Sequence, residues 1–100
     1  MCNRYEFMFR GALTFNEDIS KWNISNVTNM NRMFYSAQSF NQDISSWDVS
    51  HVISMNYMFK HAKTFNQDLS NWDVSRVKYH NDIFLGASSF DISNSPHFTT

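Results

Sequence analysis

The chain has 100 residues, of which 42% are apolar and 17% charged, a balance that predicts one folded domain rather than a disordered segment. Eight Lys and Arg against nine Asp and Glu give a formal net charge of −1, without a run of either sign, which argues against nucleic-acid binding. The single cysteine, Cys2, excludes an internal disulfide. No apolar stretch is long enough to insert into a membrane, and the residues after Met1 lack the pattern of a signal peptide.

A repeat of 25 residues fills the chain. Ungapped copies begin at Phe15, Phe40 and Phe65, and ten of the 25 columns hold the same residue in all three copies. Repeats of this length stack because one unit cannot bury its apolar face alone, so we expect a single domain over residues 1–100. The predicted parts are a half repeat at 2–14, full repeats at 15–39, 40–64 and 65–89, and a degenerate C-terminal cap at 90–100.

Each repeat is predicted to hold one strand, one helix and one turn. In the second copy, residues 47–50 alternate apolar and polar side chains, which is typical of a short strand with one buried face. Apolar residues then recur every three or four positions over 51–62, which predicts a helix beginning at Ser50. Residues 65–70 are rich in Asn, Asp and Ser and predict a turn. The expected fold is a short, right-handed, leucine-rich-repeat-like α/β solenoid with one short parallel strand and one helix per unit.

The repeat has a specific motif that covers essentially the whole chain. It reads W-[DN]-[VI]-S-x-V-x-x-M-x-x-M-F-x-x-A-x-x-F-N-x-D-[IL]-S, and one instance runs from Trp47 in the second copy to Ser70 in the third. This motif resembles the BspA-like leucine-rich-repeat surface proteins, in the 25-residue form of mycoplasma-type lipoproteins of unknown function. The resemblance implies a cell-surface or secreted protein that acts in adhesion, although the chain shows no signal peptide or lipobox.

Three invariant columns are predicted to form structural ladders along the stack. Asn and Asp side chains can hydrogen-bond to turn backbone, and this interpretation is favoured over a calcium ladder because the repeat lacks glycine-rich turns. The invariant Trp column is expected in the core rather than on a sugar-stacking platform, since a binding surface varies between copies. The ladder columns are Trp22, Trp47 and Trp72; Asn16, Asn41 and Asn66; and Asp18, Asp43 and Asp68.

The predicted function is a non-catalytic module that binds a protein or glycan partner, because the chain carries no catalytic constellation, metal motif or cofactor motif. Two alternatives remain open: a structural segment that self-assembles through the open ends of the solenoid, and a calcium-stabilised repeat. Nucleic acid is not an expected partner. The variable columns beside the expected strands are the predicted binding face, formed by Lys21, Asn23, Ser46, Asp48, Asn71 and Asp73.

Overall fold

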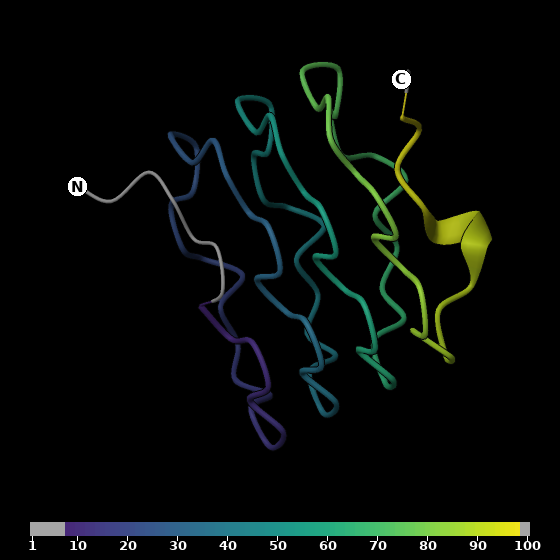
Figure 1. The fold of residues 1–100 in the computed structure, drawn as a ribbon. Coiled ribbons are helices and arrows are strands. Elements are labelled where there is room, and N and C mark those ends of the chain that lie inside the picture. Colours follow the sequence, from purple (N-terminus) through teal and green to yellow (C-terminus); the bar gives the residue numbers. More distant parts are fainter. Residues whose placement is uncertain (1–7, 99–100) are drawn as a thin grey trace.

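Successive 25-residue stretches of the chain lie side by side in chain order, from the purple end to the yellow end of Figure 1. The structure is a computed structural model that describes residues 8–98, so Cys2 and the start of the predicted half repeat lie outside the described part. We call each such stretch a coil. The first to third coils are residues 15–39, 40–64 and 65–89, and they are flanked by residues 8–14 and 90–98.

The predicted α/β solenoid is wrong. The only helix in the described range is a single 3-10 turn, η1 (Ile92–Asn94). No strand forms among residues 8–98 either, because pairing is limited to isolated parallel bridges that join Asn29 to Ser54 and Ser54 to Tyr79. These bridges lie in the segments predicted to be helical, whereas residues 47–50, the expected strand, form no bridge.

The segment predicted as a helix, residues 51–62 in the second coil, is a run of consecutive tight turns. We call this segment and its equivalents in the other coils the turn ribbon. Within the second coil, the Met58, Lys60 and Ala62 N–H groups each donate to the carbonyl three residues earlier, at 3.0–3.3 Å. The intervening N–H groups donate instead to the next coil, at 2.7–2.9 Å, so the backbone alternates between local and inter-coil hydrogen bonds. These inter-coil bonds run from Met55 to Tyr79, from Tyr57 to Asn81, from Phe59 to Ile83 and from His61 to Leu85.

Left-handed residues explain why the helical pattern misleads. Two repeat columns in these turns have positive φ, a backbone conformation that an α-helix does not accept. Successive tight turns, each closed by a hydrogen bond to the third preceding residue, still place apolar residues at spacings of three and four. The first column comprises Arg32, Tyr57 and Asp82, with φ of 57°, 59° and 50°. The second column comprises Gly11, Ser36, His61 and Gly86, with φ of 68°, 58°, 61° and 76°.

Position 86 requires glycine for two reasons: its backbone has positive φ, and the His61 side chain leaves no room for a Cβ atom. A Cβ at position 86 would lie 2.2 Å from His61 Nδ1, whereas a Cβ at Gly11 would meet nothing within 4 Å. We therefore expect Gly11→Ala to lower the free energy of unfolding by about 1 kcal/mol, the cost of a left-handed alanine, and Gly86→Ala to lower it by more.

Chemical denaturation of both variants and of the His61→Ala Gly86→Ala double variant measures this difference. In the double variant the steric part of the Gly86→Ala cost should disappear. Equal costs at positions 11 and 86, or no coupling between positions 61 and 86, would contradict this role for Gly86.

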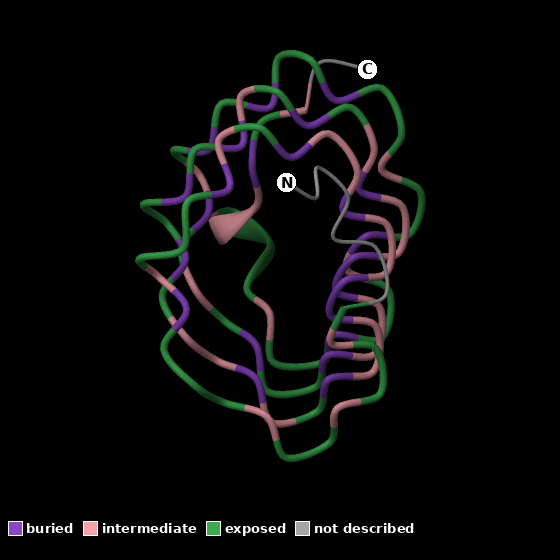
Figure 2. Ribbon diagram, turned by 90° about the vertical axis from the view of Figure 1, so that its left-hand side faces the viewer, coloured by how far each residue is buried: buried purple, intermediate pink, exposed green. Residues whose placement is uncertain are grey.

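Two parallel stacks of phenylalanine rings form the centre of the core. Phe34 near the end of the first coil and Phe40 at the start of the second lie with ring centroids 4.2 Å apart, and Phe59 and Phe65 repeat this contact at 4.3 Å. Between coils, the Phe34 and Phe59 rings are 5.4 Å apart and inclined by only 10°. Viewed along the stack, the buried residues follow the same parts of each coil (Figure 2). The stacked rings fix the coils in register, because a slip would separate every pair.

The tryptophan column is buried in two of its three members. Trp47 and Trp72 are 4% and 5% exposed, and each donates its Nε1–H over 3.1 Å to a backbone carbonyl of the preceding coil, Ile19 and Ile44 respectively. Trp22, in the first coil, is 40% exposed. A buried indole therefore joins neighbouring coils by a hydrogen bond as well as by apolar contact.

Candidate functional site

The predicted asparagine column hydrogen-bonds to backbone between coils. The Asn16 Oδ1 accepts the Asn41 N–H at 2.8 Å, and the Asn41 Oδ1 accepts the Asn66 N–H at 2.9 Å. The Asn66 Oδ1 accepts the Asp91 N–H at 2.9 Å and so extends the ladder into the C-terminal segment. These side chains are committed to backbone donors, which gives the column a structural role.

A second asparagine ladder lies in the turn ribbon. The Asn31 Oδ1 accepts the Asn56 N–H at 2.8 Å, and the Asn56 Oδ1 accepts the Asn81 N–H at 2.9 Å. This ladder accounts for the presence of asparagine, a poor helix former, at positions where the apolar spacing predicts a helix.

The aspartate column caps turns within each coil. Each Oδ1 accepts the backbone N–H of the serine two residues later, at 2.9–3.0 Å, which is the geometry of an Asx turn. Hydrogen bonds from that serine, first from its side chain and then from its backbone, hold the pKa of each aspartate below its ordinary value. The pairs are Asp18 with Ser20, Asp43 with Ser45 and Asp68 with Ser70.

These turns predict a loss of stability in acid. A depressed pKa in the folded state contributes stability above the unfolded pKa, and that contribution is lost as the pH falls through the folded pKa. We expect the Tm to be level from pH 7 to pH 5 and to fall below about pH 4. Thermal melts across this range test it, with the Asp43→Asn Asp68→Asn variant as control because asparagine keeps the acceptor without titrating. A Tm of this variant that falls as steeply as that of the wild type would contradict the assignment.

The six residues of the predicted binding face are all exposed. Three of them are held in a second set of Asx turns: the Asn23, Asp48 and Asp73 Oδ1 atoms accept N–H bonds from the serines two residues later, at 3.0–3.1 Å. The hydroxyl and backbone of the following serine also lower the pKa of Asp48 and Asp73. No described contact points to a ligand on this face, and its binding role stays a prediction.

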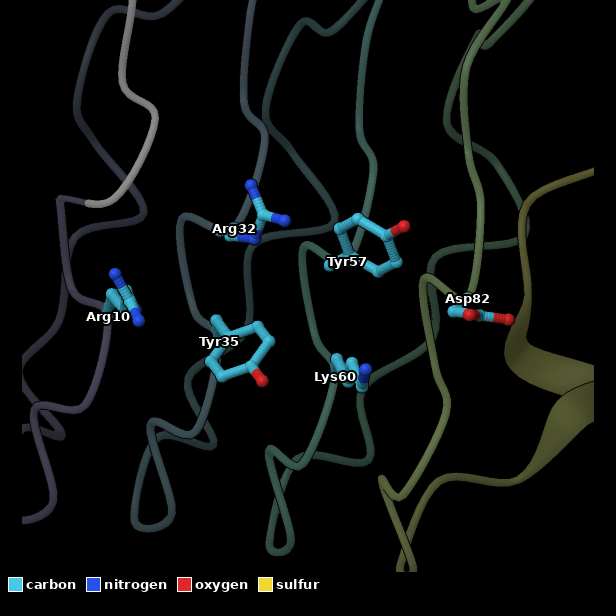
Figure 3. A pocket seen from close by; sticks show the side chains of 6 residues that line it. All are labelled: Arg10, Arg32, Tyr35, Tyr57, Lys60 and Asp82. Carbon is cyan, nitrogen blue, oxygen red and sulfur yellow. The ribbon is translucent and has the colours of Figure 1, made fainter.

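A different surface gathers side chains suited to binding. It is a groove of about 520 Å³ on the turn ribbon, and it crosses several coils (Figure 3). We call it the Arg/Tyr groove, and it is lined by Arg10, Arg32, Tyr35, Tyr57, Lys60 and Asp82.

Two tight turns place these side chains on one surface. The Tyr35 N–H donates to the Arg32 carbonyl, and one coil later the Lys60 N–H donates to the Tyr57 carbonyl, both at 3.2 Å. The first and last residues of each turn therefore face the same groove, and the left-handed backbone at positions 32 and 57 belongs to this arrangement. The inter-coil bonds set the distance from one pair to the next.

Cations lie over the tyrosine rings along the groove. The Arg32 Cζ is 4.7 Å from the Tyr57 ring centroid, and the Arg10 Cζ is 5.6 Å from that of Tyr35. The Lys60 Nζ lies between the two rings, at 5.8 Å from Tyr35 and 5.2 Å from Tyr57. Such contacts contribute about 0.5–1 kcal/mol each at exposed sites, so the tyrosine rings favour these positions of the cations before a ligand arrives.

A second groove of about 440 Å³ lies beside the isolated bridges. It carries no charged side chain, and Asn29, Ser54 and Tyr79 are the bridged residues themselves. Its lining residues are Thr28, Asn29, Asn31, Ile53, Ser54, Asn56 and Tyr79.

The Arg/Tyr groove leaves no basic run in the sequence because its cations are far apart in the chain. Arg10, Arg32 and Lys60 form no run: Arg10 and Lys60 share a repeat column two copies apart, and Arg32 stands in another column. The usable signal is variation within the repeat: the column of positions 32, 57 and 82 holds Arg, Tyr and Asp, as expected of a surface column rather than a core column.

The described part of the chain shows neither a cluster of metal-ligating side chains nor a membrane-spanning helix. Within residues 8–98, no three His, Cys, Asp or Glu side chains gather closely enough to hold a metal ion. In the same part of the chain, no helix has the length and apolar character needed to cross a membrane.

Comparison with known proteins identifies a family. The chain matches the family model described as "Mycoplasma protein of unknown function, DUF285" over residues 3–98. No curated protein and no solved structure matches the chain.

Proposed function

The chain belongs to the Mycoplasma protein family of unknown function, DUF285, and we propose that it is a non-catalytic interaction module that binds a protein or glycan partner through the Arg/Tyr groove. The observation that carries this proposal is the row of three cations held over two tyrosine rings across consecutive coils. Cations that are ordered in advance lose less conformational entropy on binding, which favours affinity.

A screen of the purified chain against immobilised extracellular-matrix proteins and glycans tests the proposal. The groove variant carries Arg10→Gln, Arg32→Gln and Lys60→Gln. The matched control variant carries Lys63→Gln, Arg76→Gln and Lys78→Gln, which changes the net charge equally at three exposed positions outside the groove.

Binding that is lost in the groove variant and kept in the control variant supports the proposal. A complete absence of binders, or equal binding by all three proteins, contradicts it. Binding that is lost only when Lys21, Asp48 and Asp73 are changed would place the function on the face expected from the sequence.

A second candidate function is self-assembly through the two ends of the stack. Large exposed apolar side chains lie mostly in the outermost parts of the described chain: Met8, Leu13 and Trp22 at one end, and Tyr79, Leu85 and Ile92 at the other, with Ile53 in the middle coil. Exposed apolar patches of this kind mark interaction sites. Light scattering tests this candidate: a dimer or larger assembly that is disrupted by Leu85→Ser Ile92→Ser supports it, and a monomer at high concentration rejects it.

The closer kinship with BspA-like surface proteins belongs to the proposal as well. It rests on the motif from Trp47 to Ser70 and its repetition through the chain, together with the family match. A cell-surface or secreted location follows from that kinship, and an adhesive role would use the same groove. Calcium is not part of the proposal, because the aspartate column accepts hydrogen bonds from serine.

A further inference from the structure

We propose that the ligand of the Arg/Tyr groove is a linear sulfated glycan, an inference that rests on the proposed function and narrows it to one ligand class. Sulfate oxygens are anionic acceptors, and the planar guanidinium groups of Arg10 and Arg32 can each donate two parallel hydrogen bonds to such a group. The ammonium group of Lys60 adds a third cation between the two tyrosine rings. The lining therefore carries three positive groups against one negative group, Asp82.

The cations follow the direction in which the coils stack. Arg10 precedes the first full coil, Arg32 lies in the first coil and Lys60 in the second, so the charges advance along the stack (Figure 3). Neighbouring backbones joined by hydrogen bonds lie about 4.8 Å apart. From Arg10 to Lys60 the charges thus advance two coils, about 10 Å along the stack. A polymer that carries an anionic group on successive or alternate sugar rings matches such a row.

Asp82 gives the groove a direction. It lies at the same turn position as Arg32 and Tyr57, but in the third coil. A polyanion is therefore attracted at the Arg10 end and repelled at the Asp82 end. Replacing Asp82 with asparagine should strengthen binding of a sulfated chain, since it removes the repulsion and keeps the shape of the side chain.

The tyrosine faces argue against a single-stranded nucleic acid. Such ligands bind by stacking their bases on aromatic rings. Here the Tyr57 ring has the Arg32 guanidinium 4.7 Å from its centroid, and the Tyr35 ring has Arg10 and Lys60 within 5.8 Å. The rings position cations rather than offering uncovered faces.

The lining also argues against a protein partner in this groove. Protein interfaces usually have a desolvated apolar centre into which the partner inserts an anchor. None of the six lining residues is aliphatic: four are charged, and the other two are tyrosines whose rings have cations nearby. A hydrated chain of sugars with anionic groups needs no such anchor.

Isothermal titration calorimetry with heparin oligosaccharides tests the proposal on the full chain. We expect saturable binding that weakens steeply as the salt concentration rises, because exposed charge pairs are screened. The groove variant should bind at least about tenfold more weakly, as expected when charge-assisted hydrogen bonds are lost. The control variant should bind like the wild type, and Asp82→Asn should bind more tightly. Thermal melts show whether each variant is folded.

Comparison ligands separate this proposal from the more general one. Chemically desulfated heparin should bind far more weakly than heparin, and poly-glutamate and oligo-dT should not compete. Heparin binding that is equal in the groove and control variants, or retained after desulfation, would overturn the sulfated-glycan assignment. If heparin does not bind but another ligand in the screen requires the groove, the ligand class is wrong and the binding function stands. If no ligand depends on the groove, both proposals fail.

Discussion

Replacing Phe59 with alanine should lower the free energy of unfolding by about 3–5 kcal/mol, the usual cost of removing a buried aromatic ring. Phe59 is fully buried, and its ring contacts Phe65 at the start of the next coil and its column neighbours Phe34 and Phe84 in the coils on either side. The loss of this ring therefore interrupts one phenylalanine stack at the middle of the protein and removes the neighbour of Phe65 in the other. Chemical denaturation measures the change.

The matched control is the same substitution at Phe84, in the same column. Phe84 lies in the last full coil and is only half-buried, so Phe84→Ala should cost less than Phe59→Ala. Equal effects at the two positions would contradict a stack whose centre is more tightly packed than its end.

Replacing Trp47 with alanine should cost about 3–5 kcal/mol as well, because the variant loses a buried indole. Trp47→Phe separates the two contributions. It keeps an apolar ring but leaves the Ile19 carbonyl without its indole donor, a loss of about 1 kcal/mol.

Trp22→Ala is the control for this column, because Trp22 is 40% exposed, and it should cost clearly less. If Trp47→Ala left stability unchanged and abolished glycan binding instead, the column would be a stacking platform, and the structural role of the buried indoles would be wrong.

The repeat predicts which residues are buried far better than it predicts backbone conformation. The expected core columns hold Trp47, Val49, Val52 and Met55, and the structure buries all four. Burial follows from the position of apolar side chains in the repeat, and this periodicity does not depend on whether the backbone is helical. Spacings of three and four arise from successive tight turns as readily as from a helix.

The prediction of backbone conformation failed at particular residues. Tyr57 and His61 have positive φ, which is uncommon for residues other than glycine, so a tyrosine or a histidine does not by itself predict a left-handed backbone. For the column of His61, the glycines Gly11 and Gly86 were the clue, because glycine in two of four copies indicates a position that tolerates φ above zero. A second clue was the asparagine at positions 31 and 56, whose side chains accept hydrogen bonds from the backbone of the next coil.

The Arg/Tyr groove could not be predicted from any one segment. Its members come from several coils, and it exists only because the inter-coil hydrogen bonds bring positions 10, 32, 35, 57 and 60 to one surface. A sequence search for a basic run finds none, since the cations are separated by more than twenty residues along the chain and adjoin only after folding.

The most direct test of a binding role for this groove is residue-resolved mapping by NMR. Heparin oligosaccharide is added to the ¹⁵N-labelled chain, and the backbone amide shifts are followed to saturation. We expect the largest changes to cluster at residues 10, 32, 35, 57 and 60, with little change at Lys21, Asp48 and Asp73. Changes confined to those last three residues, or no saturable change at all, would contradict it.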